Sequence, residues 1–236
     1  MSFLKTEWRK LALANFVVPP ECLKPYLPSG TELDYWEDKC YLSLVGLRCQ
    51  NTKVLGVKVP FHAHFEEVKL QFYVKNKDGE KWKKGVAFIK EIVPKRAISL
   101  VANAMYKEHY ETMPMRYLWE ESDDSRKVAY SWKKSDWHSF EVQASLNAID
   151  MLKGSDTEFF TEHYWGITSV DKQTSVTYEV IRPRWVYYPV FGYDVKVDFG
   201  ELIGEEFSFL NEQLPESVML AEGSMVKVES KIALQN

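Results

Sequence analysis

The sequence lacks the features of several common protein classes. Its three cysteines, Cys22, Cys40 and Cys49, have neither zinc-site spacing nor the even number typical of a disulfide framework. A reducing cytoplasm is the simplest location for such a chain. No apolar run approaches the roughly 20 residues of a membrane-spanning helix, and the first residues do not resemble a signal peptide. We therefore expect a cytoplasmic protein with no membrane partner.

The chain also has no excess of positive charge and no common catalytic motif. It carries 30 basic and 34 acidic residues, a formal net charge of −4, whereas nucleic-acid binding selects clustered Lys and Arg. The basic cluster at 81–84 follows an Asp-Gly turn and reads as a solvated strand end. Motifs of nucleotide, hydrolase and zinc-protease sites are absent. We expect no nucleic-acid partner and no cofactor.

Aromatic residues and alternating strands dominate what is present. Aromatic residues make up 14% of the chain. Residues 65–75 and 85–92 alternate with period two around the Asp78-Gly79 hairpin signal. Further strands are expected near 128–134, 137–145, 163–170, 173–181, 184–190 and 224–232. Apolar spacing predicts a main helix over about 96–109 and a weaker one over 201–211. This pattern favours a mostly β fold with a largely antiparallel, closed or nearly closed sheet.

Two carboxylates begin the first of these strands. Glu66 and Glu67 point to opposite faces, so a closed sheet would turn one of them inward. A buried carboxylate must be hydrogen-bonded, ion-paired or protonated, which makes the inward residue a candidate for handling protons or orienting a ligand. The alternative is an edge carboxylate in water.

Two further segments mix aromatic with titratable side chains. Residues 106–116 leave the main helix and include Glu108, Met115 and Arg116, and loops after rigid elements often carry function. Residues 159–166 are the densest such cluster, and period two places His163 and Trp165 on one face. A surface loop and an ordinary aromatic core are the respective alternatives.

A His-x-His pair raises the question of a metal. His62 and His64 would share one face of a strand and could bind one ion. Two ligands do not make a zinc site, however, and no second spaced motif supports it. We expect no metal and assign these residues to a turn or rim.

Several blocks resemble the YqjF-like family of bacterial proteins, whose function is unknown and which belongs to the acetoacetate decarboxylase-like superfamily. Two blocks are the most specific: one ends in Met113-Pro114-Met115, and the other contains residues 162–166. The matching stretches are 8–15, 27–34, 59–62, 65–74, 85–115, 158–166 and 220–224. Where the family usually has Asn-Leu-Arg, this chain has Lys69-Leu70-Gln71.

The resemblance implies a single domain over residues 1–236, built as a cone-shaped, mostly antiparallel β-barrel with an internal cavity, one main helix and one or two short ones. Characterised relatives decarboxylate acetoacetate through a lysine Schiff base. Phe65-x-Glu67 resembles part of their signature, which makes Glu67 the inward carboxylate. Met115 stands at the position of the Schiff-base lysine, with Arg116 beside it. A thioether forms no imine, and Arg116 stays protonated but could bind a carboxylate. Lys95 is a displaced alternative.

Three functions remain open from the sequence. The first is binding of a small apolar, carboxylate- or carbonyl-bearing molecule in the cavity without Schiff-base chemistry, through Glu67, Glu108, Met115, Arg116, His163 and Trp165. The second is a non-covalent lyase or decarboxylase-like enzyme with Glu67 as acid or base. The third is a homodimeric interaction or structural protein whose aromatics form the interface.

Overall fold

Strands far apart in the sequence form a closed ring in the computed structural model, which describes residues 2–58, 60–106 and 109–234. Each strand of the ring pairs with the next, and the last pairs with the first. In order around the ring they are β16 (Ser217–Val228), β1 (Leu4–Val18), β3 (Cys40–Val54), β5 (Phe65–Asp78), β6 (Lys81–Val93), β12 (Trp165–Ser169) and β13 (Ser175–Ile181). The pairings are antiparallel except that of β6 with β12. The mostly β, largely antiparallel fold expected from the sequence is thereby confirmed.

The β5–β6 hairpin sets the register of the wall that matters most for the site. β5 continues past the predicted 65–75 to Asp78, and the turn occupies Gly79–Glu80, beside the Asp78-Gly79 hairpin signal. Gly79 has φ +62°, a left-handed conformation that glycine adopts without steric cost. Along the hairpin, Lys69 lies opposite Glu91. On the other side of β5, Glu67 lies opposite Leu47 of β3.

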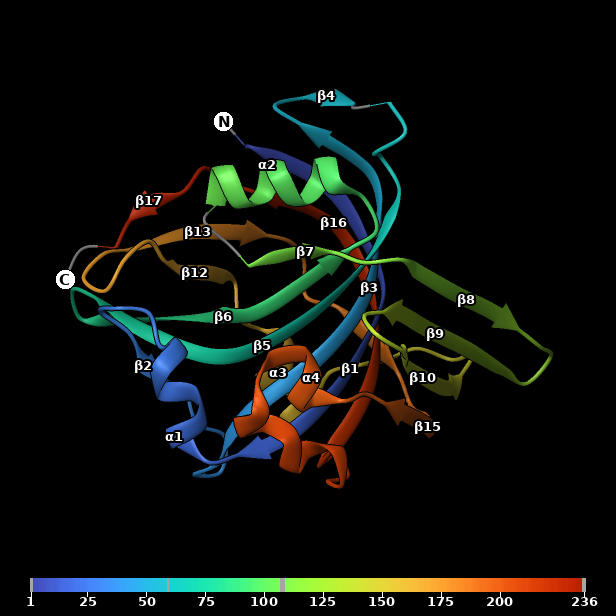
Figure 1. Cartoon of the computed structure of the whole chain (residues 1–236). Helices are drawn as coiled ribbons and strands as arrows, with labels where there is room; N and C mark the ends of the chain where they lie inside the picture. Colours follow the sequence, from blue (N-terminus) through green and yellow to red (C-terminus); the bar gives the residue numbers. More distant parts are fainter. Residues whose placement is uncertain (1, 59, 107–108, 235–236) are drawn as a thin grey trace.

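Short strands extend the ring at its ends. β2 (Glu32–Leu33) pairs with β5, β4 (Val57–Lys58) with β3, β7 (Tyr110–Thr112) with β6, and β17 (Ile232–Ala233) with β13. β14 (Val186–Tyr188) joins β16 to β11 (Ile149–Asp150). Figure 1 shows β4 at the top of the molecule, above the upper end of the ring.

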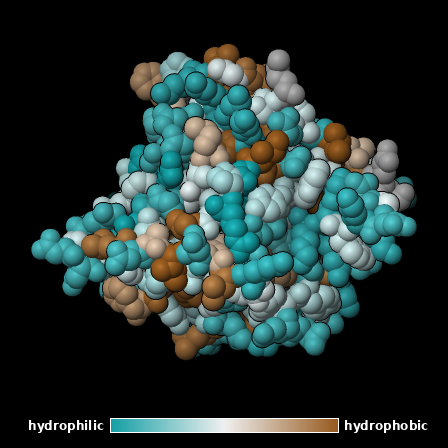
Figure 2. Space-filling model, turned by 180° about the vertical axis from the view of Figure 1, so that it is seen from behind, coloured by the Kyte–Doolittle hydropathy of each residue, from teal (hydrophilic) through white to brown (hydrophobic). Residues whose placement is uncertain are grey.

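A second sheet projects beside the ring (Figure 1). Its order is β15 (Val190–Lys196), β10 (Trp137–Ser145), β9 (Ser125–Lys133) and β8 (Met115–Glu121), all antiparallel. Tyr130 and Trp132 of β9 are fully buried against the ring. Figure 2 shows the rear face as largely hydrophilic, with hydrophobic side chains gathered beside this projection.

Helices close the ends of the ring. α2 (Arg96–Tyr106) crosses the upper end (Figure 1) and matches the helix expected over 96–109. The weaker helix expected over 201–211 is present as α4 (Phe199–Ile203) and the 3₁₀ helix η2 (Glu205–Asn211). The remaining helices are α1 (Pro20–Leu23), η1 (Lys24–Tyr26) and α3 (Asp156–Thr161). Ser155 caps α3 by accepting a hydrogen bond from the Glu158 amide. No described helix is long and apolar enough to cross a membrane.

The ring strands are buried on both faces, and this creates two hydrophobic clusters. In β1, Leu11 and Leu13 belong to the cluster inside the ring, whereas Ala12 and Ala14 belong to the cluster between the ring and the second sheet. This division follows from the period-two alternation of side chains along a strand. The inner cluster surrounds the site described next.

Candidate functional site

A cavity of about 240 Å³ lies inside the ring. Its mostly apolar walls come from the ring strands, and α2 lines it from above. Aromatic side chains supply much of the lining: Phe3, Trp8, Phe65, Phe88, Phe160, Trp165, Tyr178 and Trp185. The volume is below the roughly 300–1,000 Å³ of drug-sized ligand pockets. The cavity therefore suits a small molecule.

A buried lysine is the main polar feature of the wall. Lys69 Nζ lies 3.2 Å from Glu67 Oε1 and 3.2 Å from Glu91 Oε1. The lysine side chain is 9% exposed, and the two carboxylate side chains are 4% and 0% exposed. Glu67 and Lys69 share a face because they are two residues apart on β5, and Glu91 reaches them from the facing position on β6. Paired charges of this kind are how a protein tolerates ionised groups away from water.

Further donors converge on Glu67. The Tyr110 hydroxyl donates to Glu67 Oε1 over 2.6 Å, and the Cys49 thiol donates to Oε2 over 3.6 Å. Burial, and then the nearby charge of Glu67, raise the pKa of Cys49 well above its usual range. The thiol therefore stays protonated and acts as a hydrogen-bond donor, not as a nucleophile. Lys69, Glu67, Glu91, Tyr110 and Cys49 are together called the Lys69 cluster.

Several groups that attract a cation surround Lys69. Besides the two carboxylates, the faces of Trp8 and Phe88 lie with their ring centroids 5.4 and 4.8 Å from Nζ. Both kinds of contact stabilise an ammonium ion. Imine formation requires the neutral amine, which a lysine gains from an apolar pocket or an adjacent cation. At Lys69 two carboxylates contact Nζ in place of a cation, so the arrangement suits a hydrogen-bond donor.

His163 and Trp165 also line the cavity. His163 precedes β12 and is buried, with Nδ1 2.7 Å from the Phe159 carbonyl oxygen and Nε2 3.1 Å from Asp34 Oδ2. Burial lowers the pKa of His163, and the hydrogen bond that the imidazole donates to Asp34 opposes this effect. Lys84 Nζ lies 2.9 Å from the same Asp34 oxygen. Both ring nitrogens thus have protein partners, which fixes the orientation of the imidazole.

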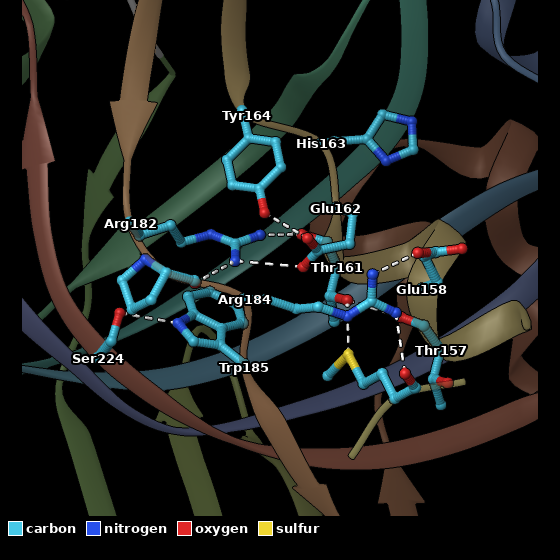
Figure 3. A network of polar contacts seen from close by, with 12 residues as sticks. Thr157, Glu158, Thr161, Glu162, His163, Tyr164, Arg182, Arg184, Trp185 and Ser224 are labelled. Atoms are coloured by element: carbon cyan, nitrogen blue, oxygen red, sulfur yellow. Dashed lines mark hydrogen bonds and ion pairs between the residues drawn. The ribbon is translucent and has the colours of Figure 1, made fainter. Parts of the chain in front are cut away.

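A buried arginine braces the same wall. Arg182 lies with its guanidinium carbon 3.7 Å from the centroid of the Trp185 ring and pairs with Glu162. Trp185 in turn donates to Ser224 Oγ over 2.8 Å. Figure 3 shows this network, with the His163 ring directed away from it. The contacts rigidify the Trp185 side of the cavity.

Two of the residues predicted from the sequence, Met115 and Arg116, lie outside the cavity lining. Arg116 is exposed on β8, and its guanidinium carbon lies 4.2 Å from the centroid of the Trp137 ring. Met115 is partly buried and packs against the hydrophobic cluster between the ring and the second sheet. Neither is among the described residues that line the cavity. The prediction that Arg116 and Met115 contact a ligand in the cavity therefore does not fit this lining, because β8 leaves the ring for the second sheet. Glu108 lies outside the described residues.

The two histidines considered for a metal are placed at the rim. His62 lines the cavity with Nδ1 2.8 Å from the Pro60 carbonyl oxygen, and His64 lies in the loop that follows β4. Within residues 2–58, 60–106 and 109–234, no group of three or more His, Cys, Asp or Glu side chains is placed to hold a metal ion.

Sequence reasoning missed most of the Lys69 cluster. Lys69 could have been found, since it is two residues from Glu67 on the same strand and must share its face. Glu91, Tyr110 and Cys49 could not, because they come from three other strands whose pairing is not encoded locally.

Comparison with known structures identifies the fold. An acetoacetate decarboxylase-like enzyme from Sphingomonas wittichii RW1 matches with a TM-score of 0.65 and 10% identity, over 100% of this chain and 94% of that one. Acetoacetate decarboxylase from Legionella pneumophila matches with a TM-score of 0.65 and 11% identity, over 98% and 87%. The enduracididine biosynthesis enzyme MppR, solved with pyruvate, matches with a TM-score of 0.69 and 10% identity, over 100% and 91%. At these identities the likeness shows the fold alone.

Sequence comparison identifies the family. A search of curated proteins gives no match. The DUF2071 family, described as an uncharacterized conserved protein, matches residues 5–225. The chain therefore belongs to the DUF2071 (YqjF-like) family and has the acetoacetate decarboxylase-like fold.

Proposed function

We propose that the ring cavity binds a small, largely apolar molecule through a carbonyl or carboxylate oxygen, without Schiff-base chemistry. The observation that carries this proposal is the ammonium of Lys69, held between Glu67 and Glu91 in an otherwise mostly apolar wall. A ligand oxygen would accept a hydrogen bond from Lys69. The aromatic walls would cover the rest of the ligand, as small-molecule sites generally do.

The size of the cavity narrows the ligand class. A volume of about 240 Å³ suits a short-chain or single-ring compound. Aromatic and aliphatic walls favour a body without charge, because burying an unpaired ion is costly. Short methyl ketones, β-keto acids and short carboxylic acids are therefore suitable probes.

Calorimetric titration with acetoacetate, 2-heptanone and hexanoate tests the proposal. Lys69→Met should weaken binding of the best probe by about tenfold or more, because a charge-assisted hydrogen bond contributes about 1.5–3 kcal/mol. Lys90→Met is the matched control, since Lys90 on β6 pairs with Glu111 and does not line the cavity. Equal loss in both variants, or binding by neither the native protein nor its variants, contradicts the proposal.

A pair of alanines on α2 gives a test that does not depend on the buried lysine. Ala102 lines the cavity, whereas Ala104 is exposed. Ala102→Phe should fill the cavity and abolish binding, and Ala104→Phe should leave it unchanged. Binding that survives Ala102→Phe would place the ligand elsewhere.

The Tyr110–Glu67 contact favours a second candidate, a non-covalent lyase with Glu67 as acid or base. A hydroxyl 2.6 Å from a carboxylate at the cavity wall can pass a proton to and from a substrate. The test is turnover of a β-keto acid panel, with Glu67→Gln as the inactive variant. Borohydride should trap no covalent adduct, and a trapped adduct would exclude a non-covalent mechanism.

A further inference from the structure

Exposed apolar side chains surround the upper end of the ring. Leu55 and Val57 of the β3–β4 hairpin are 62% and 66% exposed, Phe61 in the following loop is 92% exposed, and Leu100 of α2 is 70% exposed. β4 and α2 lie together at the top of the molecule, where Figure 2 also shows hydrophobic side chains. Such a cluster differs from scattered surface residues and marks an interaction site. These residues, with the basic ones named next, are called the mouth rim.

The same two segments carry only positive charge. Lys53 and Lys58 flank the exposed hairpin, Lys95 directly precedes α2 and Arg96 begins it. The sequence contains no Asp or Glu over 51–65 or 92–107. The mouth rim is therefore basic within a chain whose net charge is negative.

The backbone holds Phe61 outward at a cost. Leu55 and Phe61 have φ of +49° and +64°, a left-handed conformation that is uncommon for bulky residues. The Lys95 ammonium donates to the carbonyl oxygens of Phe61 and His64, which ties the loop to the start of α2. Strained positions of this kind concentrate at functional sites.

The mouth rim is continuous with the cavity. Val54, next to the exposed hairpin tip, lines the cavity, as do His62 in the loop and Ala97 and Val101 in α2. Val101 is also 47% exposed. The cavity therefore reaches the surface beside α2, among the exposed apolar side chains.

We propose that the mouth rim docks on the surface of an anionic lipid bilayer. Leu55, Val57 and Phe61 enter the boundary between headgroups and acyl chains, and the lysines and Arg96 contact lipid phosphates, which is the usual chemistry of interfacial attachment. The cavity then opens toward the acyl chains. An apolar ligand can pass between bilayer and cavity without crossing water, a consequence that rests on the proposed function, whereas docking itself does not.

The expectation of no membrane partner rests on the absence of an apolar run long enough to span a bilayer. The mouth rim is instead assembled from segments about forty residues apart, which meet only in the fold. Attachment through loops and one helix face needs no spanning element.

Sedimentation of the full chain with lipid vesicles tests the proposal. We expect binding to phosphatidylcholine–phosphatidylglycerol vesicles, at least about fivefold weaker binding to phosphatidylcholine alone, and loss of binding at high salt. Phe61→Ser and Lys58→Glu should each weaken binding about fivefold or more, since one basic residue near such a surface contributes about 1 kcal/mol. Both positions are exposed, so folding should persist, as circular dichroism can verify.

Matched controls distinguish binding through the mouth rim from non-specific binding to vesicles. Phe191→Ser removes another exposed aromatic, on β15, and Lys172→Glu reverses an exposed charge before β13; both should leave vesicle binding unchanged. Ala102→Phe, which fills the cavity, should still bind vesicles, so failure of ligand binding is distinguishable from failure of docking. The proposal is overturned by absent vesicle binding, by equal effects of the controls, or by a solution dimer that Phe61→Ser converts to a monomer.

Discussion

The Nζ of Lys69 lies 3.2 Å from Glu67 Oε1, and both side chains project from one face of β5 into the cavity wall. Neither residue would be stable there alone, because an isolated buried ion loses far more solvation than the protein returns. The pair therefore forms a unit with Glu91 on the next strand. The acetoacetate decarboxylase-like fold holds this unit where a ligand in the cavity would meet it.

Removing the lysine should therefore destabilise the protein. Lys69→Met leaves Glu67 and Glu91 buried without the ammonium, and breaking a buried ion pair costs about 3–5 kcal/mol. Urea denaturation at neutral pH measures the free energy of unfolding. Lys90→Met, which breaks the more exposed pair with Glu111, should cost less than about 1 kcal/mol. Similar losses in both variants would contradict a special role for Lys69.

Local periodicity was sufficient to predict the hairpin that carries this pair. The alternation over 65–75 placed Glu67, Lys69 and Gln71 on one face, and the structure has all three in the cavity wall. Periodicity could not say which face was inward, since both faces of β5 are buried, one by the ring interior and one by the second sheet. That choice came from the resemblance to a family.

Long-range pairing is what the sequence could not supply. The sequence predicts that Pro114 and the residues after it continue the loop beyond α2. In the structure the residues after Pro114 begin β8, which pairs with β9, and Arg116 therefore lies against Trp137. α3 was also missed, because its six residues are too few for a helical period to be visible. The first error concerns contacts decided by tertiary structure, whereas the second follows from the short length of α3.

The contact between Gly46 and Tyr130 should be essential for packing the second sheet on the ring. A Cβ at Gly46 of β3 would lie 2.3 Å from Tyr130 Cδ2, and the fully buried Tyr130 also donates to the Lys10 carbonyl oxygen over 2.8 Å. Gly46→Ala should lower the free energy of unfolding by about 1–3 kcal/mol. Thermal and urea denaturation can measure this loss.

Two further variants check the cause of that loss. At Gly192, an added Cβ meets its nearest neighbour at 3.5 Å, an ordinary contact, so Gly192→Ala should be close to neutral. In a double-mutant cycle, Tyr130→Leu should make Gly46→Ala less costly, because the clashing ring is gone. Strictly additive effects would rule out the steric explanation.

Acid should weaken the His163 end of the cavity through Asp34. Burial raises the pKa of Asp34, but hydrogen bonds from His163 and Lys84 outweigh this and hold the pKa below its usual value of 3.8. The unfolded chain therefore binds a proton more readily than the folded one as pH falls. The stability that Asp34 contributes is fully present above about pH 4 and is lost as pH falls through the folded pKa.

The pH dependence of the unfolding free energy tests this assignment. Asp34→Asn should be less stable than the native chain near neutral pH and should lose less stability on acidification below about pH 4. The exposed Asp123→Asn should keep the native profile. If Asp34→Asn lost as much unfolding free energy on acidification as the native chain does, other carboxylates would be the cause of the pH dependence of stability.

The cysteines should differ sharply in reactivity. The thiolate is the reactive form, and burial followed by the charge of Glu67 raises the pKa of Cys49 well above its usual range. Cys22 is only half-buried, although burial raises its pKa too. At about pH 8, iodoacetamide should modify Cys22 first and Cys49 only after unfolding in guanidinium, where all three cysteines should react at similar rates. Peptide mass spectrometry resolves the order, and rapid native modification of Cys49 would mean that Glu67 is not held by a protonated thiol.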